Sequence, residues 1–338
     1  MIMEAYDRIA PHTINTPLLS SHSLNKIAQR KIWVKAECLQ HTGSFKYRGG
    51  WSAISALSAD EKSRGVITFS SGNHAQGIAA AAAYHDVPAT IIMPSDSPGV
   101  KIKNTKSLGA KVILYDRETE DRGKVEREVN SDKSLVLIKP YDNHHVIAGQ
   151  GSVGIEISKQ SNKKGIKDAE VIVCAGGGGL ASGIALSLEK LNPKMIVRTA
   201  EPDNFDDIKR SLKSGKIERN TKTSGSVCDA VLTLCPGEIT FPILKKLCGA
   251  GFSVSDDEAI KAMVLNRIGD FGLVLGILII FVEYKAVDYA TVFALTPIFT
   301  NKLFNFFNSI FSPNPYLWSN IMDCLYVVID IFYFFSNS

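Results

Sequence analysis

The order of apolar and helical segments constrains the fold of this 338-residue chain more than any other feature. Short apolar runs that predict strands alternate with segments that predict helices, such as the alanine-rich residues 73–84. The predicted strands are residues 32–37, 65–69, 89–94, 111–115, 171–175 and 195–200. Such alternation is typical of βαβ units, in which parallel strands are covered by the helices between them. The sequence therefore predicts an α/β protein, and its length suits two domains.

Composition and charge exclude several classes of protein. The net charge of +4 is small for this length and argues against a dedicated nucleic-acid binder, which would carry a concentrated basic face. The six cysteines form no C-x-x-C pair, which favours a reducing, intracellular setting. The first residues lack a basic region followed by an apolar run. We therefore expect a cytoplasmic protein without a signal peptide.

The segment 42–50 places one lysine, Lys46, among small residues and next to one aromatic residue, Phe45. It lies where a helix is predicted to begin. A Schiff-base lysine needs this setting, because its amine must be held against a carbonyl group with little bulk around it and a flat apolar surface nearby. Most lysines are solvated surface charges, so the interpretation depends on motifs elsewhere in the chain.

A second motif, residues 70–77, is a turn of small polar residues between a predicted strand and a predicted helix. Free N–H groups at a helix N-terminus favour an anion, and a substrate carboxylate has the right size and charge. Asn73 can offer its amide to a ring oxygen, and the hydroxyl of Ser71 could move a proton. The alternative is structural, an N-cap serine with a turn asparagine, and the segment alone favours it.

Four glycines, Gly176–Gly179, directly follow a predicted strand and open a predicted helix. Their amides can point inward and form a phosphate cradle at the positive end of the helix. The spacing is neither a G-x-G-x-x-G motif nor a P-loop. A flexible linker is the alternative, and the placement between an apolar strand and an apolar helix disfavours it.

The acidic loop 201–207 follows the next predicted strand. Carboxylates on a loop at a strand end can bind a hard cation through oxygen. Spacing alone favours a simpler alternative, a solvated acidic loop that caps the next helix.

Taken together, the motifs resemble the fold-type II pyridoxal-phosphate enzymes, specifically the threonine/serine ammonia-lyase (dehydratase) and serine racemase family. The resemblance covers about residues 4–275 and includes the further segments 17–19, 147–151, 228–230 and 236–238. It implies a two-domain, tryptophan synthase β-like fold of parallel sheets covered by helices. Residues 1–64 and 142–275 would form the large cofactor-binding domain and residues 65–141 the small domain, in a homodimer.

The resemblance also implies a binding site for pyridoxal 5'-phosphate. Lys46 would hold the cofactor as a Schiff base and take the substrate α-proton. Phe45 would pack beside the pyridine ring, and Asn73 would bond the ring hydroxyl oxygen. The phosphate would bind the amides of Gly176, Gly177, Gly178, Gly179 and Leu180.

For the substrate, the resemblance assigns the carboxylate to the turn formed by Ser71, Gly72, Asn73 and His74. Ser71 matches the serine that acts as the second acid–base group in the racemases. A site for Mg²⁺ or another divalent cation would use the remaining matched residues, namely Glu201, Asp207 and the carbonyl of Phe205.

The implied activity is conversion of a small hydroxy amino acid, L-threonine or L-serine, into a 2-oxo acid and ammonia. Serine racemase is the alternative, because a proton returned by Ser71 to the opposite face would give the D-amino acid. An inactive, cofactor-binding relative is a third possibility, since neither the family's Glu-Pro-x-Gly-Ala stretch nor its Ser/Cys-Gly-Gly-Asn turn, whose first side chain bonds the pyridine nitrogen, occurs in the chain.

The resemblance stops after about residue 275, and residues 276–338 form a divergent apolar and aromatic tail whose structure the pattern does not predict. Its longest uncharged apolar runs are about 12 residues, short of the roughly 20 that a helix needs to span a bilayer. We therefore expect no membrane partner.

Overall fold

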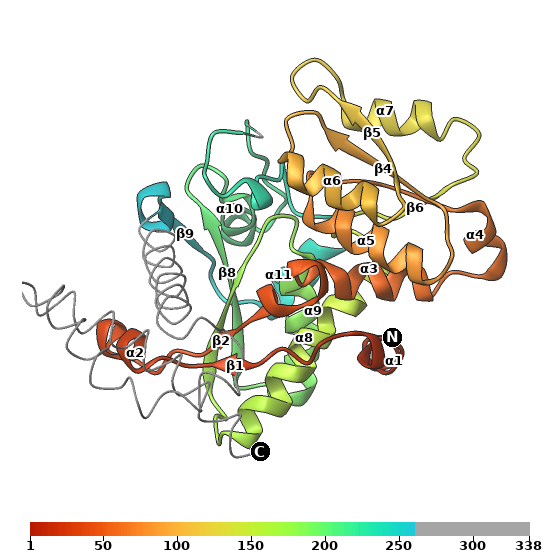
Figure 1. Ribbon diagram of the computed structural model, residues 1–338. Coiled ribbons are helices and arrows are strands. Elements are labelled where there is room, and N and C mark those ends of the chain that lie inside the picture. Colours follow the sequence, from red (N-terminus) through yellow and green to blue (C-terminus); the bar gives the residue numbers. More distant parts are fainter. Residues whose placement is uncertain (223, 261–338) are drawn as a thin grey trace, which may run out of the picture. The chain divides into compact units, whose positions relative to one another are not determined.

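Figure 1 shows the protein as a computed structural model. The structure describes residues 1–222 and 224–260, so the predicted tail at 276–338 lies outside the described residues. The chain divides into two compact units, Met1–Asp256 and Asp257–Ser338. The fold below is that of the first unit.

The N-terminal segment combines short helices with one antiparallel strand pair, and it leads directly into the helix that begins at Lys46. Strand β1 pairs with β2 so that Leu18 lies opposite Lys35. In chain order the elements are α1 (Ile2–Ile9), η1 (Ala10–His12), β1 (Leu18–Leu19), α2 (His22–Ala28), β2 (Val34–Lys35), η2 (Glu37–Leu39), η3 (His41–Gly43) and α3 (Lys46–Ser55).

The next segment builds a four-stranded parallel sheet in the order β5-β4-β3-β6. Its two central strands, β3 and β4, are apolar and mostly buried, as is typical of strands covered by helices on both faces. The elements are α4 (Ala59–Arg64), β3 (Val66–Phe69), α5 (Asn73–Tyr84), β4 (Ala89–Pro94), α6 (Gly99–Ser107), β5 (Lys111–Tyr115), α7 (Arg122–Val129) and β6 (Val136–Leu137).

A long helix, α8 (His144–Lys163), then leads to a second parallel sheet in the order β7-β8-β9. Its elements are β7 (Ala169–Cys174), α9 (Gly179–Leu191), β8 (Met195–Pro202), α10 (Asp207–Ser214), η4 (Asp229–Val231), α11 (Thr240–Leu247) and β9 (Phe252–Val254). Two parallel sheets with covering helices confirm the predicted α/β class.

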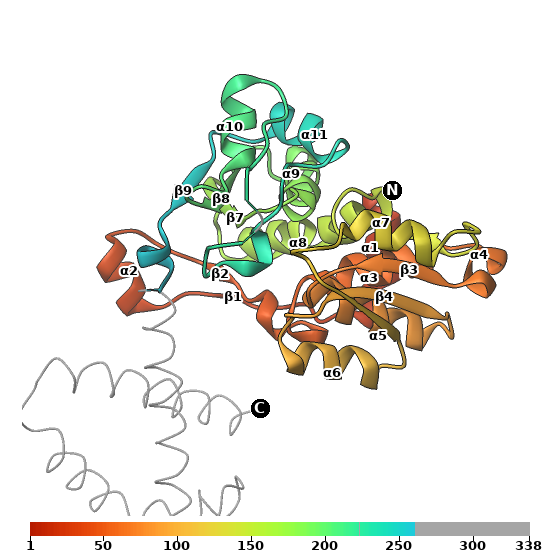
Figure 2. The same ribbon diagram turned by 90° about the horizontal axis from the view of Figure 1, so that it is seen from above.

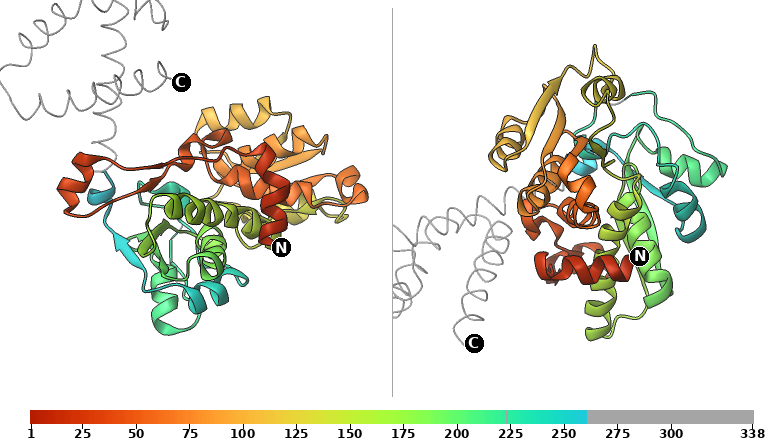
Figure 3. Two further views of the ribbon diagram at one scale, coloured as in Figure 1. Left: turned by 90° about the horizontal axis from the view of Figure 1, so that it is seen from below. Right: turned by 90° about the vertical axis from the view of Figure 1, so that its right-hand side faces the viewer.

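Helix α8 is shared by the two halves of the fold, the first half with the four-stranded sheet and the second half with the three-stranded sheet. It packs against α3 on one side and α9 on the other, as Figure 2 shows from above. The N-terminal helix α1 also packs on it, as the views in Figure 3 show. The largest core cluster includes Trp51, Ile54 and Ile78, and a separate cluster lies around α9 and β8. The second half therefore has a core of its own, joined to the first through α8.

A buried ion-pair network ties α3 to α8. Arg48 is 0% exposed, and its Nη1 donates to Glu156 Oε1 at 2.7 Å while its Nε donates to Glu37 Oε2 at 2.8 Å. Lys35 Nζ completes the network, 2.6 Å from Glu156 Oε2. Burying these charges has a large desolvation cost, which pairing of this quality offsets. Arg48 lies two residues after Lys46, so the network fixes the position of the helix that carries Lys46.

Removing Arg48 should reveal the desolvation cost of the carboxylates that it pairs with. We expect Arg48→Met to lower the free energy of unfolding by about 3–5 kcal/mol, because the partly buried Glu37 loses its cation and the buried Glu156 keeps only Lys35. The matched control is Arg64→Met in the partly exposed Arg64–Asp60 pair, with an expected loss below about 1 kcal/mol. Urea denaturation followed by circular dichroism measures both. Equal losses in the two variants would contradict the assigned role of the network.

Candidate active site

Lys46 is the first residue of α3, as the sequence predicts, and its side chain is partly buried. Its Nζ donates to the carbonyl oxygen of Pro140 at 3.0 Å and lies 5.3 Å from the centre of the Phe45 ring. Burial disfavours the charged ammonium and lowers the pKa of Lys46 to about 8. A substantial fraction of the amine is therefore neutral near physiological pH, which a nucleophilic lysine requires.

Two glycines let α3 approach α5 closely. A Cβ on Gly50 would lie 2.8 Å from the carbonyl oxygen of Gly77, and a Cβ on Gly77 would lie 3.0 Å from the carbonyl group of Lys46. Any larger residue at either position would push the helices apart. Because Gly77 lies one helical turn after Asn73, this contact brings the start of α3 next to the start of α5.

The turn between β3 and α5 offers unpaired donors. Gly72 precedes the first helical residue, and no side chain caps the helix, so the N-cap interpretation of Ser71 is wrong. In the described part of the chain, the first amide of α5 with a backbone acceptor is that of Gln76, which donates to the carbonyl oxygen of Gly72 at 3.0 Å. The three amides of α5 before it and the side chains of Ser71 and Asn73 have no partner there, so an anion could bind them.

His74 lies beneath this turn and is buried. Its Nε2 is 3.5 Å from the carbonyl oxygen of Ile138, and its Nδ1 has no hydrogen-bond partner among the described residues. Burial, and then the nearby charge of Lys46, lower the pKa of His74 to about 3. The ring is therefore neutral at physiological pH, and its unpartnered nitrogen is a polar atom available inside the site.

The glycine run adopts the conformation that a phosphate cradle needs. Gly178 has φ +88°, and it precedes α9, which begins at Gly179. Gly177, Gly178 and Gly179 are buried, which rules out the flexible linker. Across the described residues, no amide from Gly176 to Ala181 donates a hydrogen bond, and the first that does is Ser182, to the carbonyl oxygen of Gly178 at 2.9 Å. This row of free amides at a helix N-terminus suits a phosphate group.

Residues 140 and 141 connect Lys46 with the glycine run. The Lys46 ammonium contacts Pro140, and the side chain of the next residue, Tyr141, packs on Gly177 so closely that a Cβ there would overlap its ring. Sequence reasoning missed both residues. Their position just beyond β6, which is parallel to β3, was the available signal, because the carboxyl ends of parallel strands share one edge of a sheet.

The two carboxylates of the predicted cation site are buried, so the solvated-loop alternative is wrong. Glu201 does cap α10, since its two oxygens accept from the amides of Ile208 and Lys209 at 2.9 and 2.8 Å. Asp207 Oδ1 accepts from Asn220 at 2.6 Å, while Oδ2 is buried without a partner among the described residues. No cluster of three or more His, Cys, Asp or Glu residues suited to a metal occurs in residues 1–222 and 224–260.

Burial raises the pKa of Glu201 to about 8 and that of Asp207 to about 7. The neighbouring carboxylates add to both shifts, whereas the amide and Asn220 hydrogen bonds oppose them. A cation at Asp207 Oδ2 would replace the proton that this geometry otherwise favours.

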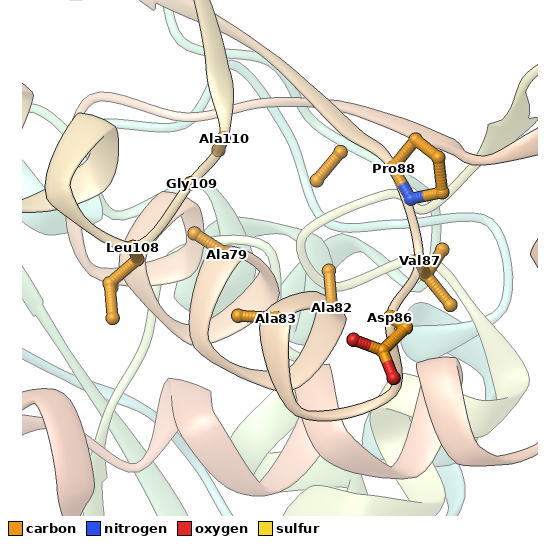
Figure 4. Close-up of a pocket in the computed structure, with 10 residues that line it drawn as sticks. Ala79, Ala82, Ala83, Asp86, Val87, Pro88, Leu108, Gly109 and Ala110 are labelled. Carbon is orange, nitrogen blue, oxygen red and sulfur yellow. The ribbon is translucent and has the colours of Figure 1, made fainter.

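A surface pocket of about 270 Å³ lies apart from these residues (Figure 4). It is lined by the C-terminal part of α5 and by the turn that leads into β5, and none of the predicted site residues borders it. It is apolar except for Asp86. The predicted chemistry therefore belongs to the opposite end of α5. No helix of the described residues is long and apolar enough to cross a membrane.

Comparison with known proteins defines the class of this site. The family model described as "Pyridoxal-phosphate dependent enzyme" matches residues 9–275, and the chain belongs to that family. The match ends where the predicted tail begins. The protein is therefore an enzyme of the fold-type II family of lyases and racemases, with pyridoxal phosphate as its cofactor. The free glycine-run amides, the Lys46 amine and the unpartnered His74 nitrogen fit that cofactor.

The similar proteins narrow the family further. The chain is 40% identical over 262 residues to the L-threo-3-hydroxyaspartate ammonia-lyase of Saccharomyces cerevisiae, covering 78% of this chain and 79% of that protein. It is 39% identical to the serine racemase of Schizosaccharomyces pombe, covering 78% and 80%. The crystal structure of a threonine deaminase from T.th. matches with a TM-score of 0.73 and 39% identity, covering 78% and 84%. The chain is therefore a member of the ammonia-lyase and racemase branch.

The raised carboxylate pKa values predict a specific pH dependence of stability. Because the folded values lie above the ordinary 4.5 and 3.8, protonation favours folding, and this contribution is complete below about pH 4 and lost as the pH rises through about 8. We expect Glu201→Gln to be stabilised relative to wild type at pH 8 compared with pH 5 by more than about 1 kcal/mol. Thermal unfolding in chelator measures this, with the exposed Glu170→Gln as the control. A pH-independent difference would contradict the burial argument.

Proposed function

We propose that this enzyme is a dehydratase (ammonia-lyase) that converts L-threonine or L-serine into a 2-oxo acid and ammonia. One observation carries the proposal. The buried amine of Lys46, with its lowered pKa, contacts Pro140, and the adjacent Tyr141 packs on a run of glycines with free amides. The nucleophilic amine of Lys46 and the phosphate cradle of the glycine run are thus linked through the consecutive residues Pro140 and Tyr141.

The proposed roles at the cofactor follow from this arrangement. Lys46 would hold the cofactor covalently, Phe45 would pack beside its ring, and Asn73 would donate its amide to the ring hydroxyl oxygen. The amides of residues 176–180 would bind the phosphate. The cofactor, when bound, supplies an electron sink that makes the substrate α-proton removable.

At the substrate, the free amides of the turn Ser71–His74 would hold the carboxylate and fix its orientation. With the cofactor bound, Lys46 Nζ would be the nearest base to the substrate α-proton and would take it. The β-hydroxyl would leave as water once it gains a proton, and the resulting enamine would hydrolyse to the 2-oxo acid and ammonia. The contact with Pro140 would hold the amine beside the site before the cofactor binds.

The principal test replaces Lys46. We expect Lys46→Ala to abolish both the visible absorbance of the cofactor–lysine linkage and the formation of 2-oxo acid, because the variant lacks the buried amine that contacts Pro140. Absorbance spectroscopy and a coupled 2-oxo acid assay measure the two effects. Lys124→Ala is the control, because that side chain is 71% exposed and should leave both readouts unchanged.

Two outcomes would contradict the proposal. Turnover that persists in Lys46→Ala would refute the role of this residue. A wild-type protein that stays colourless with added pyridoxal phosphate would favour the inactive relative instead.

Serine racemase is the second candidate, and the position of Ser71 favours it. The hydroxyl is half-buried in the turn and makes no hydrogen bond to another described residue, so it is free to move a proton. A proton taken on one face by Lys46 and returned on the other by Ser71 would invert the α-carbon. The serine racemases among the similar proteins agree with this possibility.

The two candidates separate in one variant. We expect Ser71→Ala to lower D-serine formation from L-serine at least about tenfold more than it lowers pyruvate formation, since a general acid–base group contributes typically about 10²–10⁴-fold and elimination can proceed without this one. Chiral chromatography and a pyruvate assay on the same samples give the ratio. Ser70→Ala is a matched control in the same turn. Equal losses of both products would contradict an acid–base role for Ser71.

We also propose that Glu201, Asp207 and the carbonyl of Phe205 bind Mg²⁺ or another divalent cation. The unpartnered Asp207 Oδ2 supports this, although Glu201 already accepts two amide hydrogen bonds. In that case Mg²⁺ should raise the melting temperature of wild type at pH 8 and leave Glu201→Gln unchanged. The division into a small domain, 65–141, and a large domain, 1–64 with 142–275, is likewise a proposal, supported by the four-stranded sheet that lies wholly within residues 65–141. We further propose that the protein is cytoplasmic and forms a homodimer.

A further inference from the structure

Lys101, near the start of α6, packs directly on the proposed substrate turn. A Cβ on Gly72 would overlap Lys101 Cδ and lie 3.1 Å from Cε and 3.2 Å from Nζ. The lysine stem therefore fills the space that a side chain at position 72 would need. Its ammonium lies against the backbone that precedes the free amides of α5.

The packing of α6 on α5 fixes this position. One turn further along both helices, Asn104 Nδ2 donates to Gln76 Oε1 at 3.3 Å. Thr105, which is fully buried, donates from its hydroxyl to the carbonyl oxygen of Lys101 at 2.8 Å. Lys101 is thus held beside Gly72 by the register of two helices and does not depend on a loop.

The Lys101 ammonium has no acidic partner among the described residues. Within them it makes neither an ion pair nor a side-chain hydrogen bond, whereas Lys35 and Lys209 of the same chain each have a carboxylate nearby. The turn beside it contains no charged side chain, because His74 is neutral at physiological pH. Lys101 is thus a partly buried cation without a counter-ion, and it lies next to the free amides at the N-terminus of α5. A carboxylate bound there would accept hydrogen bonds and pair with the positive charge.

We propose that Lys101 binds the α-carboxylate of the amino-acid substrate and supplies the positive charge that the Ser71–His74 turn lacks. The inference rests on the proposed function, because it assigns one more contact to the same substrate. Gly72 then has a second purpose. The absence of a side chain at this position leaves room for the lysine stem beside the turn.

The test compares Lys101→Met with Lys103→Met. Both variants remove one positive charge from α6 and keep an unbranched apolar stem, but Lys103 is exposed and makes no contact with Gly72. Glycine and glycinamide are the probes, since they differ only in the carboxylate. Their dissociation constants are measured on the cofactor-loaded proteins from the change in visible absorbance.

We expect Lys101→Met to weaken glycine binding about 10- to 100-fold, the range of one hydrogen bond to a charged group, and to change glycinamide binding less than about twofold. Lys103→Met should change neither. For L-serine, Lys101→Met should raise KM by a similar factor with little change in kcat, and Lys101→Arg should recover part of the loss. Unchanged glycine binding, or equal weakening for both probes, would overturn the inference.

Three further results keep the inference separate from its alternatives. Gly72→Ala should weaken glycine binding in wild type but add little in the Lys101→Met background, because both changes displace the same ammonium. If Lys101→Met impairs L-threo-3-hydroxyaspartate but leaves L-serine unaffected, the ammonium binds a second carboxylate and the inference is wrong. A wild type that binds glycine yet forms no 2-oxo acid would refute the proposed dehydratase activity while leaving the role of Lys101 intact.

Discussion

The close approach of α3 and α5 at Gly50 and Gly77 is the contact on which the candidate site depends. Helices with ordinary side chains at their contact lie about 8–10 Å apart, and that separation would move Lys46 away from the start of α5. With glycine at both positions, Lys46 at the start of α3 lies beside Gly77, one helical turn after the start of α5. The Arg48 network then fixes the second face of α3 against α8. Lys46 is therefore positioned by packing on two sides.

The fold and the positions of the main motifs could be predicted because each depends on local chemistry. Residues 73–84, 89–94 and 111–115 were predicted with the bounds that the structure has, since alanine-rich and β-branched runs have strong local preferences. Lys46 and Gly179 were likewise expected near helix starts, because small residues precede both. Motifs at the carboxyl ends of parallel strands then come together by topology alone.

Tertiary contacts could not be predicted in the same way. Tyr141 packs on the glycine run, and Lys101 packs on Gly72, over sequence separations that no local pattern reports. Burial decides the remaining cases. Spacing alone favoured a solvated loop at Glu201 and Asp207, yet both side chains are inaccessible. The packing of α10 on β8 contributes to this burial, and Asn220 donates to Asp207 Oδ1 from beyond α10. The loop sequence predicts neither contact.

Desolvation shifts the pKa values at the two proposed sites in opposite directions, and this difference explains their chemistry. At Lys46 it disfavours the ammonium and leaves a nucleophilic amine, whereas at Glu201 and Asp207 it disfavours the carboxylates and favours a proton or a cation. The substrate turn must attract an anion, but it must do so without a negative side chain nearby, because such a side chain would raise the pKa of Lys46. Neutral donors, a neutral His74 and free helix amides meet that requirement, and Lys101 adds charge from outside the turn.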